Sequence, residues 1–212
     1  MVERQKDKAM TEQLTTEKQA VILDAARKRF AYYGFSKVTM DEIAADVGLG
    51  KASLYYYFPT KEGLFVEVIK GEKNQFLSDI QAMIDAKSAP CDMLRQYAQL
   101  RIQHFRELAN LRALQFQQSP EGRTSFLQLF KEFQLQEVGL LAQLLELGNK
   151  TGEFSVYDPR KAAEIIIQMF YGPRAWLMHK RENKLDDDSY RLLEQATDEI
   201  AEMILNGIRN RK

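Results

Sequence analysis

Apolar residues recur at helical spacing along most of this chain. Between residues 60 and 86, for example, Leu64, Phe65, Val68 and Ile69 keep one face of a helix apolar. No segment alternates apolar and polar residues as a half-buried strand would. We therefore predict an all-α fold of about nine helices, over residues 16–33, 39–47, 50–58, 60–86, 91–108, 111–117, 125–147, 158–179 and 188–208.

The segment TMDEIAADVGLGKASLYYYF, residues 39–58, predicts two short helices around a tight turn. Thr39 and Glu42 have the spacing of a capping box at the start of the first helix. Gly48 suits the left-handed backbone conformation that commonly ends a helix. A helix, a turn with glycine and a second helix form the helix-turn-helix pattern, which places its second helix in a DNA groove.

The second helix of this motif presents polar and aromatic side chains outward. Because Leu54 and Phe58 form its apolar side, the remaining residues face away from the core: Lys51, Ala52, Ser53, Tyr55, Tyr56 and Tyr57. Ammonium and hydroxyl groups donate to phosphate oxygens, and a small alanine permits a close approach to a groove. The alternative is a buried aromatic cluster, but three consecutive helical residues cannot all face one core. We expect this face to contact DNA, together with Lys61 in the first turn of the next helix.

The segment LGKASLYYYFPTKEGL resembles the recognition-helix region of the TetR family of bacterial transcriptional regulators. The features that match are Leu54-Tyr55, Tyr56-Tyr57, Phe58 and Lys61-Glu62. Upstream, Tyr33-Gly34-Phe35 and Thr39 are similar to the family's aromatic corner and to the threonine before its second helix. The resemblance covers residues 16–70 and implies that Thr39, Lys61 and the outward residues of the second helix bind DNA.

The same segment departs from the family pattern at three positions. Gly50 stands where a serine often caps the recognition helix, and Ala52 stands where glycine or proline is common. Tyr57 stands where histidine is common. These departures concern which operator sequence is bound and leave the DNA-binding role unchanged.

The polar, non-periodic residues 1–14 predict a flexible arm. Together with the resemblance, this gives three parts. They are the arm, a helix-turn-helix DNA-binding domain over residues 15–62, and an effector-binding and dimerisation domain over residues 63–212.

Composition and charge limit the other functions that this chain can have. An apolar content of 45% and a charged content of 28% fit a globular protein. The single cysteine, Cys91, excludes an internal disulfide and suits a reducing cytoplasm. We find no signal peptide and no apolar run long enough to span a bilayer. The formal net charge is zero, so the positive charge that DNA binding requires must be placed locally.

Catalytic and metal-binding patterns are not found in the sequence. His104 and His179 are far apart in the sequence, and neither has a second His or a Cys nearby at metal-ligand spacing. We interpret His104 as a partly buried helix residue and His179 as a solvated helix end. The chain lacks a phosphate-binding loop, a dinucleotide-binding glycine fingerprint and a nucleophile elbow. We therefore predict that the protein is not an enzyme and has no cofactor and no metal site.

Large apolar residues are frequent in the C-terminal two-thirds, and helical core is the simplest interpretation of any one of them. The resemblance adds another, because TetR family members bind a small inducer between helices of this region and dimerise through their last two helices. For an apolar or amphipathic effector, the residues assigned are His104, Phe105, Arg112, Phe116, Phe126, Phe130, Met169, Tyr171 and Trp176. For the dimer interface, they are Ile166, Phe170, Leu193, Ile200, Met203 and Ile204.

These observations predict a cytoplasmic, homodimeric repressor that a small molecule releases from a palindromic operator in double-stranded DNA. Two alternatives stay open. One is a DNA-binding protein without effector control, which ligand-induced loss of operator binding would exclude. The other is an all-α interaction module or enzyme with a vestigial headpiece, which the absence of any sequence-specific DNA site would favour.

Overall fold

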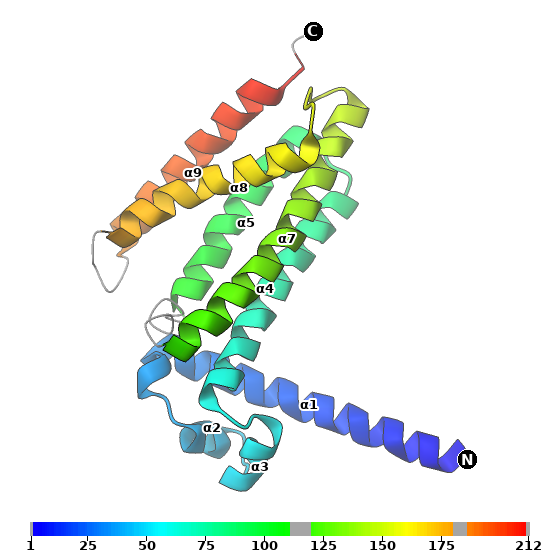
Figure 1. The fold of residues 1–212 in the computed structure, drawn as a ribbon, viewed down its shortest axis with the longest axis vertical. Coiled ribbons are helices and arrows are strands. Elements are labelled where there is room, and N and C mark those ends of the chain that lie inside the picture. The colour runs from blue at the N-terminus through cyan, green and yellow to red at the C-terminus, as the bar shows by residue number, and fades with distance from the viewer. Residues whose placement is uncertain (1, 111–119, 180–185, 211–212) are drawn as a thin grey trace. The chain divides into compact units, whose positions relative to one another are not determined.

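The computed structural model describes the backbone of residues 2–110, 120–179 and 186–210, and the side chains of residues 14–108, 124, 127–175 and 186–210. These residues form an all-α structure, which confirms the predicted fold class (Figure 1). The helices are α1 (Val2–Tyr33), the short 3-10 helix η1 (Phe35–Lys37), α2 (Met40–Asp46), α3 (Lys51–Tyr57), α4 (Lys61–Asp85), α5 (Pro90–Asn110), α7 (Pro120–Thr151), α8 (Pro159–His179) and α9 (Asp187–Ile208). The helix predicted over residues 111–117 lies outside the described residues.

Helix α1 corrects the prediction of a flexible arm over residues 1–14. The helix begins at Val2 and runs without interruption to Tyr33, so Thr16 lies inside it and does not cap its start. The physical reason is composition, because residues 2–15 contain many good helix formers and no glycine or proline. The sequence prediction placed the start of this helix at residue 16, fourteen residues too late.

Helix α7 is longer than predicted at both ends. It begins at Pro120, before the predicted start at residue 125, because proline is well suited to the first turn of a helix. It continues past the predicted end at residue 147 to Thr151, and Gly152 follows with a φ of 75°. The chain then reverses, and Phe154 packs against Gly148, where an added Cβ atom would lie 1.9 Å from the phenyl ring.

The chain forms two compact units. The first consists of residues 1–72 and 107–129, and the second of residues 73–106 and 130–212. Helix α4 therefore contributes Lys61–Glu72 to the first unit and Lys73–Asp85 to the second. The predicted boundary between residues 62 and 63 falls near the beginning of this same helix.

The core of the first unit brings α1, α2, α3 and the beginning of α4 together. Phe30 and Phe65 are both buried, and their rings meet edge to face with centroids 4.9 Å apart. Ile43 of α2 and Leu54 of α3 are fully buried. This packing fixes the two short helices on a rigid base, which a pair of seven-residue helices could not provide alone.

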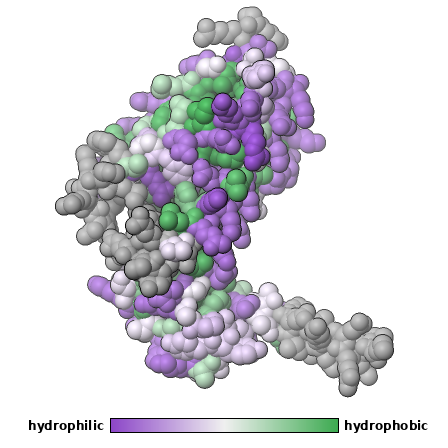
Figure 2. Space-filling model, in the orientation of Figure 1, coloured by the Kyte–Doolittle hydropathy of each residue, from purple (hydrophilic) through white to green (hydrophobic). Residues whose placement is uncertain are grey.

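The core of the second unit is built from the end of α4 and from α5, α7, α8 and α9. Its largest fully buried side chain is Tyr97, which is packed among apolar residues of the neighbouring helices. The surface of this unit carries apolar residues among hydrophilic ones on the face seen in Figure 2. Within the described residues, no helix is long and apolar enough to cross a membrane.

Candidate DNA-binding surface and ligand site

The capping box predicted at the start of α2 is confirmed. The backbone N–H of Glu42 donates to Thr39 Oγ1 at 3.3 Å, and the backbone N–H of Thr39 donates to Glu42 Oε2 at 2.8 Å. At the other end of α2, Gly48 has a φ of 65°, which explains the glycine. The backbone N–H of Leu49 then donates to the carbonyl of Ala44 at 2.9 Å. These bonds set the turn between α2 and α3.

Helix α3 presents the side chains that the sequence placed outward. Lys51, Ala52, Ser53, Tyr55 and Tyr56 are exposed, and the exposed fraction of Tyr56 is 80%. Leu54 and Phe58 are buried, whereas Tyr57 is half-buried with its ring 5.4 Å from that of Tyr56. The alternative of a buried aromatic cluster is therefore excluded, and α3 offers hydroxyl and ammonium donors on one open face.

The acidic residues of α2 are paired with cations. The ammonium group of Lys51 donates to Asp41 at 3.0 Å, and this hydrogen bond raises the pKa of Lys51. Arg29 of α1 binds Asp46, with Nη2 to Oδ1 at 2.8 Å, and lowers the pKa of that carboxyl. Arg29 also lies 3.4 Å from Glu42. These ion pairs neutralise the carboxylates of α2 and so reduce the negative field beside the exposed face of α3. A chain of zero net charge can therefore still present a surface that accepts phosphate.

Lys61 has partners inside the first unit that the sequence did not indicate. Its Nζ donates to the carbonyls of Phe35 and Val38, both at 3.1 Å, and lies 4.4 Å from the centroid of the Phe35 ring. The side chain therefore ties the beginning of α4 to the segment that follows α1. This internal role was missed because the two carbonyls are distant in sequence, and it leaves one of the three ammonium protons for a phosphate.

The residues assigned to an effector pocket have different locations. His104, Phe105, Phe130 and Tyr171 belong to the second unit and take part in one set of ring and charge contacts, described below. Met169 does not belong to this set, because its side chain is 37% exposed on the outer surface of α8. Arg112 and Phe116 lie outside the described residues, as do the side chains of Phe126 and Trp176.

A cluster of polar and charged groups lies inside the second unit, and only two of its members, His104 and Tyr171, were predicted as site residues from the sequence. We call it the buried charge cluster, and its members are Lys73, Tyr97, Arg101, His104, Glu137, Tyr171 and Arg174. Glu137 is fully buried, and its Oε1 accepts from the hydroxyl of Tyr97 at 2.8 Å and from the guanidinium group of Arg101. Burial raises the pKa of Tyr97 well above its usual value, so this hydroxyl stays protonated and acts as a donor.

Lys73 is the most unusual member of the buried charge cluster. Its exposed fraction is 2%, and among the described residues its Nζ has no hydrogen-bond acceptor. The ammonium group lies 3.8 Å from the centroid of the Phe133 ring and 4.3 Å from that of Phe130. Burial lowers the pKa of Lys73 to about 7, although the charge of Glu137 acts in the opposite direction. A lysine in this environment is a functional candidate because an unpaired buried charge is costly.

Two more members of the buried charge cluster are held against aromatic rings. The ring of His104 stacks on Phe76 with centroids 4.6 Å apart, and its buried Nε2 has no hydrogen-bond partner in the described part of the chain. Burial lowers the pKa of His104 to about 3, so the ring is neutral at pH 7. The guanidinium group of Arg174 lies 4.4 Å from the centroid of the Phe105 ring, and burial lowers its pKa to about 10.

A signal for these buried charges was present in the sequence. Lys73 follows Ile69 by four residues and precedes Phe76 by three, so it occupies a core position of an apolar helix stripe. Arg101 and Glu137 occupy equivalent positions on α5 and α7. A charged residue at a core position requires a partner or a function, and searching the stripes for such residues would have found the cluster.

The structure places the residues predicted for the dimer interface in two different environments. Ile166, Phe170, Leu193 and Ile204 are buried within a single chain, where they form part of the core of the second unit. They were chosen as apolar residues of the last two helices, and periodicity alone cannot tell which apolar face meets a neighbouring helix. Ile200 is half-buried, whereas Met203 has an exposed fraction of 66% and stays available to a partner.

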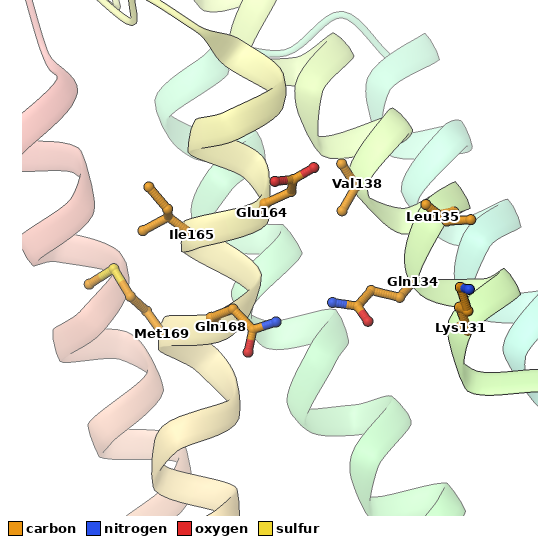
Figure 3. Close-up of a pocket in the computed structure, with 8 residues that line it drawn as sticks. All are labelled: Lys131, Gln134, Leu135, Val138, Glu164, Ile165, Gln168 and Met169. Atoms are coloured by element: carbon orange, nitrogen blue, oxygen red, sulfur yellow. The ribbon is translucent and has the colours of Figure 1, made fainter. Parts of the chain in front are cut away.

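A groove between α7 and α8 carries further exposed apolar residues. It has a volume of about 730 Å³ and is lined by Lys131, Gln134, Leu135, Val138, Glu164, Ile165, Gln168 and Met169. Gln134 and Gln168 extend toward each other across it, whereas Ile165 and Met169 lie on the side of α8 away from α7 (Figure 3). Ile165 is 54% exposed. The exposed apolar side chains of α8 were not separated from its buried ones by the sequence analysis.

Comparisons of family, structure and sequence all match this chain to regulatory proteins. A model of the bacterial regulatory proteins of the tetR family matches residues 22–68. A transcriptional regulator from Cytophaga hutchinsonii, known from its crystal structure, is 37% identical, and the match covers 91% of this chain and 98% of that chain with a TM-score of 0.85. The fatty acid metabolism regulator protein of Bacillus subtilis is 26% identical over 195 residues, which are 90% of this chain and 95% of that protein.

One solved structure with the same fold contains a bound small molecule. The transcriptional regulator FadR from Bacillus subtilis, in complex with stearoyl-CoA, has a TM-score of 0.62 and 23% identity, and the match covers 90% of this chain and 99% of that chain. Helix α3 follows α2 after a short turn and presents an exposed face, and this arrangement is that of a helix-turn-helix DNA-binding protein. The chain belongs to the TetR family of bacterial transcriptional regulators, whose members are not enzymes.

Proposed function

We propose that this regulator is a cytoplasmic homodimeric repressor, and that a small molecule bound in the second unit lowers its affinity for a palindromic operator. The observation that carries the proposal is the buried charge cluster, because three of its polar atoms have no hydrogen-bond partner among the described residues and a bound ligand would supply one. The relative in complex with stearoyl-CoA supports it, as a protein of this fold that is known with a bound small molecule.

The DNA-binding part of the proposal rests on the open face of α3. Lys51, Ser53 and Tyr55 lie at the beginning and on the outer side of the helix, where they would reach base edges in a major groove. Tyr56, Tyr57 and the remaining proton of Lys61 would contact phosphates, as would groups near the capped start of α2 at Thr39. To reach a base edge, the ammonium group of Lys51 must break its hydrogen bond to Asp41. An acceptor on a guanine edge would then replace the carboxylate.

Coupling between ligand and DNA would use helix α4. This helix holds Lys61 in the first unit and Lys73 in the second, and no break interrupts it between these residues. A ligand that draws the ammonium group of Lys73 toward itself would act on the same helix that contains Lys61. Control then follows if the ligand has different affinities for the conformers that bind and release the operator.

A measurement of operator release tests the proposal. Operator DNA labelled with a fluorophore is titrated with the purified full-length protein, with and without a deproteinised small-molecule extract of the source cells. We expect the extract to weaken operator binding by about 5–150-fold, the usual range of coupling between two sites. Operator binding that no fraction of the extract changes would favour the alternative of a DNA-binding protein without effector control.

A further inference from the structure

We infer that the ligand of the second unit is an organic carboxylate whose negative group is held by Lys73, Arg101 and Arg174. The inference rests on the function proposed above and names the chemical class of the molecule that regulates it. It depends on the charges and the unpaired atoms of the buried charge cluster, taken together with the space around them.

Among the residues that the structure describes, the cationic side chains of the cluster outnumber its carboxylates. Three cationic side chains, Lys73, Arg101 and Arg174, face one carboxylate, Glu137, among the described residues. His104 is neutral, and the hydroxyl of Tyr97 is a neutral donor. Because Glu137 already binds Arg101, the positive charges of Lys73 and Arg174 have no direct ion-pair partner in the described structure. A ligand with a negative group would restore the balance.

The unpaired atoms point to the same class of ligand. The Nζ of Lys73 can donate three hydrogen bonds and donates none to the described residues, so it would accept a ligand that brings an acceptor. Within the same described residues Glu137 Oε2 has no donor, and it would accept one from a water molecule or a hydroxyl group of the ligand. A cationic ligand could satisfy Glu137 but would add a further positive charge to an excess of cations, so it is disfavoured.

The space around the cluster indicates how such a ligand would act. A cavity of about 20 Å³ is lined by Arg101, Ile102, Phe105, Phe170, Arg174, Leu193 and Thr197, which is room for about one water molecule. An organic carboxylate must therefore separate α5, α8 and α9 in order to enter. Its apolar part would meet aromatic rings, since Phe130 and Phe133 already lie against Lys73. Binding that requires such a rearrangement is the kind that shifts a conformational equilibrium.

Lys73 makes the affinity depend on pH. In the free protein its pKa is about 7, whereas a bound carboxylate would hold the proton and raise that pKa. Below pH 7 the lysine is already charged and affinity is constant; above pH 7 binding must take up a proton, so affinity falls by up to about tenfold per pH unit. The charged groups that act on Lys73 are Glu137, Arg174 and Arg101. The other titratable members of the cluster are His104, Tyr97 and Tyr171, and none of them ionises between pH 7 and 9.

The experiment compares ligands that share an apolar part and differ in their charged group. Butanoate, octanoate, decanoate and phenylacetate are tested by calorimetry and thermal unfolding, each beside the matching alcohol and the matching trimethylammonium compound. We expect carboxylates to bind and to raise the Tm, and their affinity to fall between pH 7 and 9. Lys73→Met should weaken this binding by about tenfold to a hundredfold, as expected when a charge-assisted hydrogen bond is lost.

The same variant gives a readout that needs no ligand. Since an apolar residue would remove an uncompensated buried charge, Lys73→Met should raise the Tm of the free protein by several degrees. We expect the Tm of the wild type to rise from pH 7 to 9, where the folded state binds fewer protons at Lys73 than the unfolded state, and Lys73→Met should remove this rise. Lys161→Met, at an exposed position of α8, is the matched control and should change neither quantity.

The inference is overturned if alcohols or ammonium compounds bind as tightly as the carboxylates. It is also overturned if no carboxylate raises the Tm of the wild type by more than that of Lys73→Met, or if Lys73→Met lowers the Tm of the free protein. Failure of the proposed function looks different, because a carboxylate would then bind and depend on Lys73 while operator affinity stays the same.

Discussion

Replacing Glu137 with alanine is expected to lower the free energy of unfolding by about 3–5 kcal/mol, the usual cost of breaking a buried ion pair from one side. Glu137 is fully buried and is the acceptor for both Tyr97 and Arg101. Its removal leaves the guanidinium group of Arg101 without a counter-charge beside the buried Lys73. Urea unfolding followed by circular dichroism measures the change.

Two further variants test this reason for the loss. Glu146→Ala, at an exposed position of the same helix, should change the free energy of unfolding by less than about 0.5 kcal/mol. Adding Lys73→Met to Glu137→Ala should recover part of the loss, since the two sites are coupled through charge. A Glu137→Ala protein as stable as the wild type would mean that Glu137 is not the counter-charge of this cluster.

Replacing Met203 with glutamate is expected to split the proposed dimer and to weaken operator binding by about 10²–10⁴-fold, the range that avidity contributes when two binding modules are joined. Met203 lies on α9 with 66% of its side chain exposed, so the substitution removes little packing within one chain. Association would bury the new carboxylate among apolar residues, and the free energy of its desolvation would exceed what the interface gains. Sedimentation measures the oligomeric state, and fluorescence anisotropy measures operator affinity.

Met203 is a better choice for this test than Ile200, which was also predicted for the interface. Ile200 is half-buried and packs against the core of its own chain, so a charge there would also destabilise the monomer. Tyr157→Glu, at a fully exposed position, should leave both the dimer and operator affinity unchanged. A wild type that is monomeric at micromolar concentration would contradict the proposed interface, as would a dimeric Met203→Glu protein.

The DNA-binding motif was predictable because its determinants are local. The capping box joins Thr39 and Glu42, three residues apart, and the glycine of the turn depends on the backbone conformation of one residue. Helical spacing then separates buried Leu54 from the exposed tyrosines of the same short helix. Each of these features is decided within one or two turns of the chain, so the sequence contains the information directly.

The ligand site was not predictable in the same way, because its parts meet only in three dimensions. Glu137 binds Arg101, which is 36 residues away in sequence, and the partners of Lys61 lie 23 and 26 residues away. Spacing indicates that a charged residue occupies a core position but not which residue compensates it. For the same reason, apolar periodicity could not separate the buried Ile166 from the neighbouring exposed Ile165.

The central claim is that this protein recognises a specific DNA sequence with two symmetry-related recognition helices. Repeated selection from a library of random double-stranded DNA, with the purified full-length protein, tests it most directly. We predict enrichment of one palindromic site whose half-sites are separated by about 10–10.5 base pairs or a multiple of that length, as two-fold symmetry on B-form DNA requires. Selection that returns no enriched sequence, or only a single half-site, would contradict the claim.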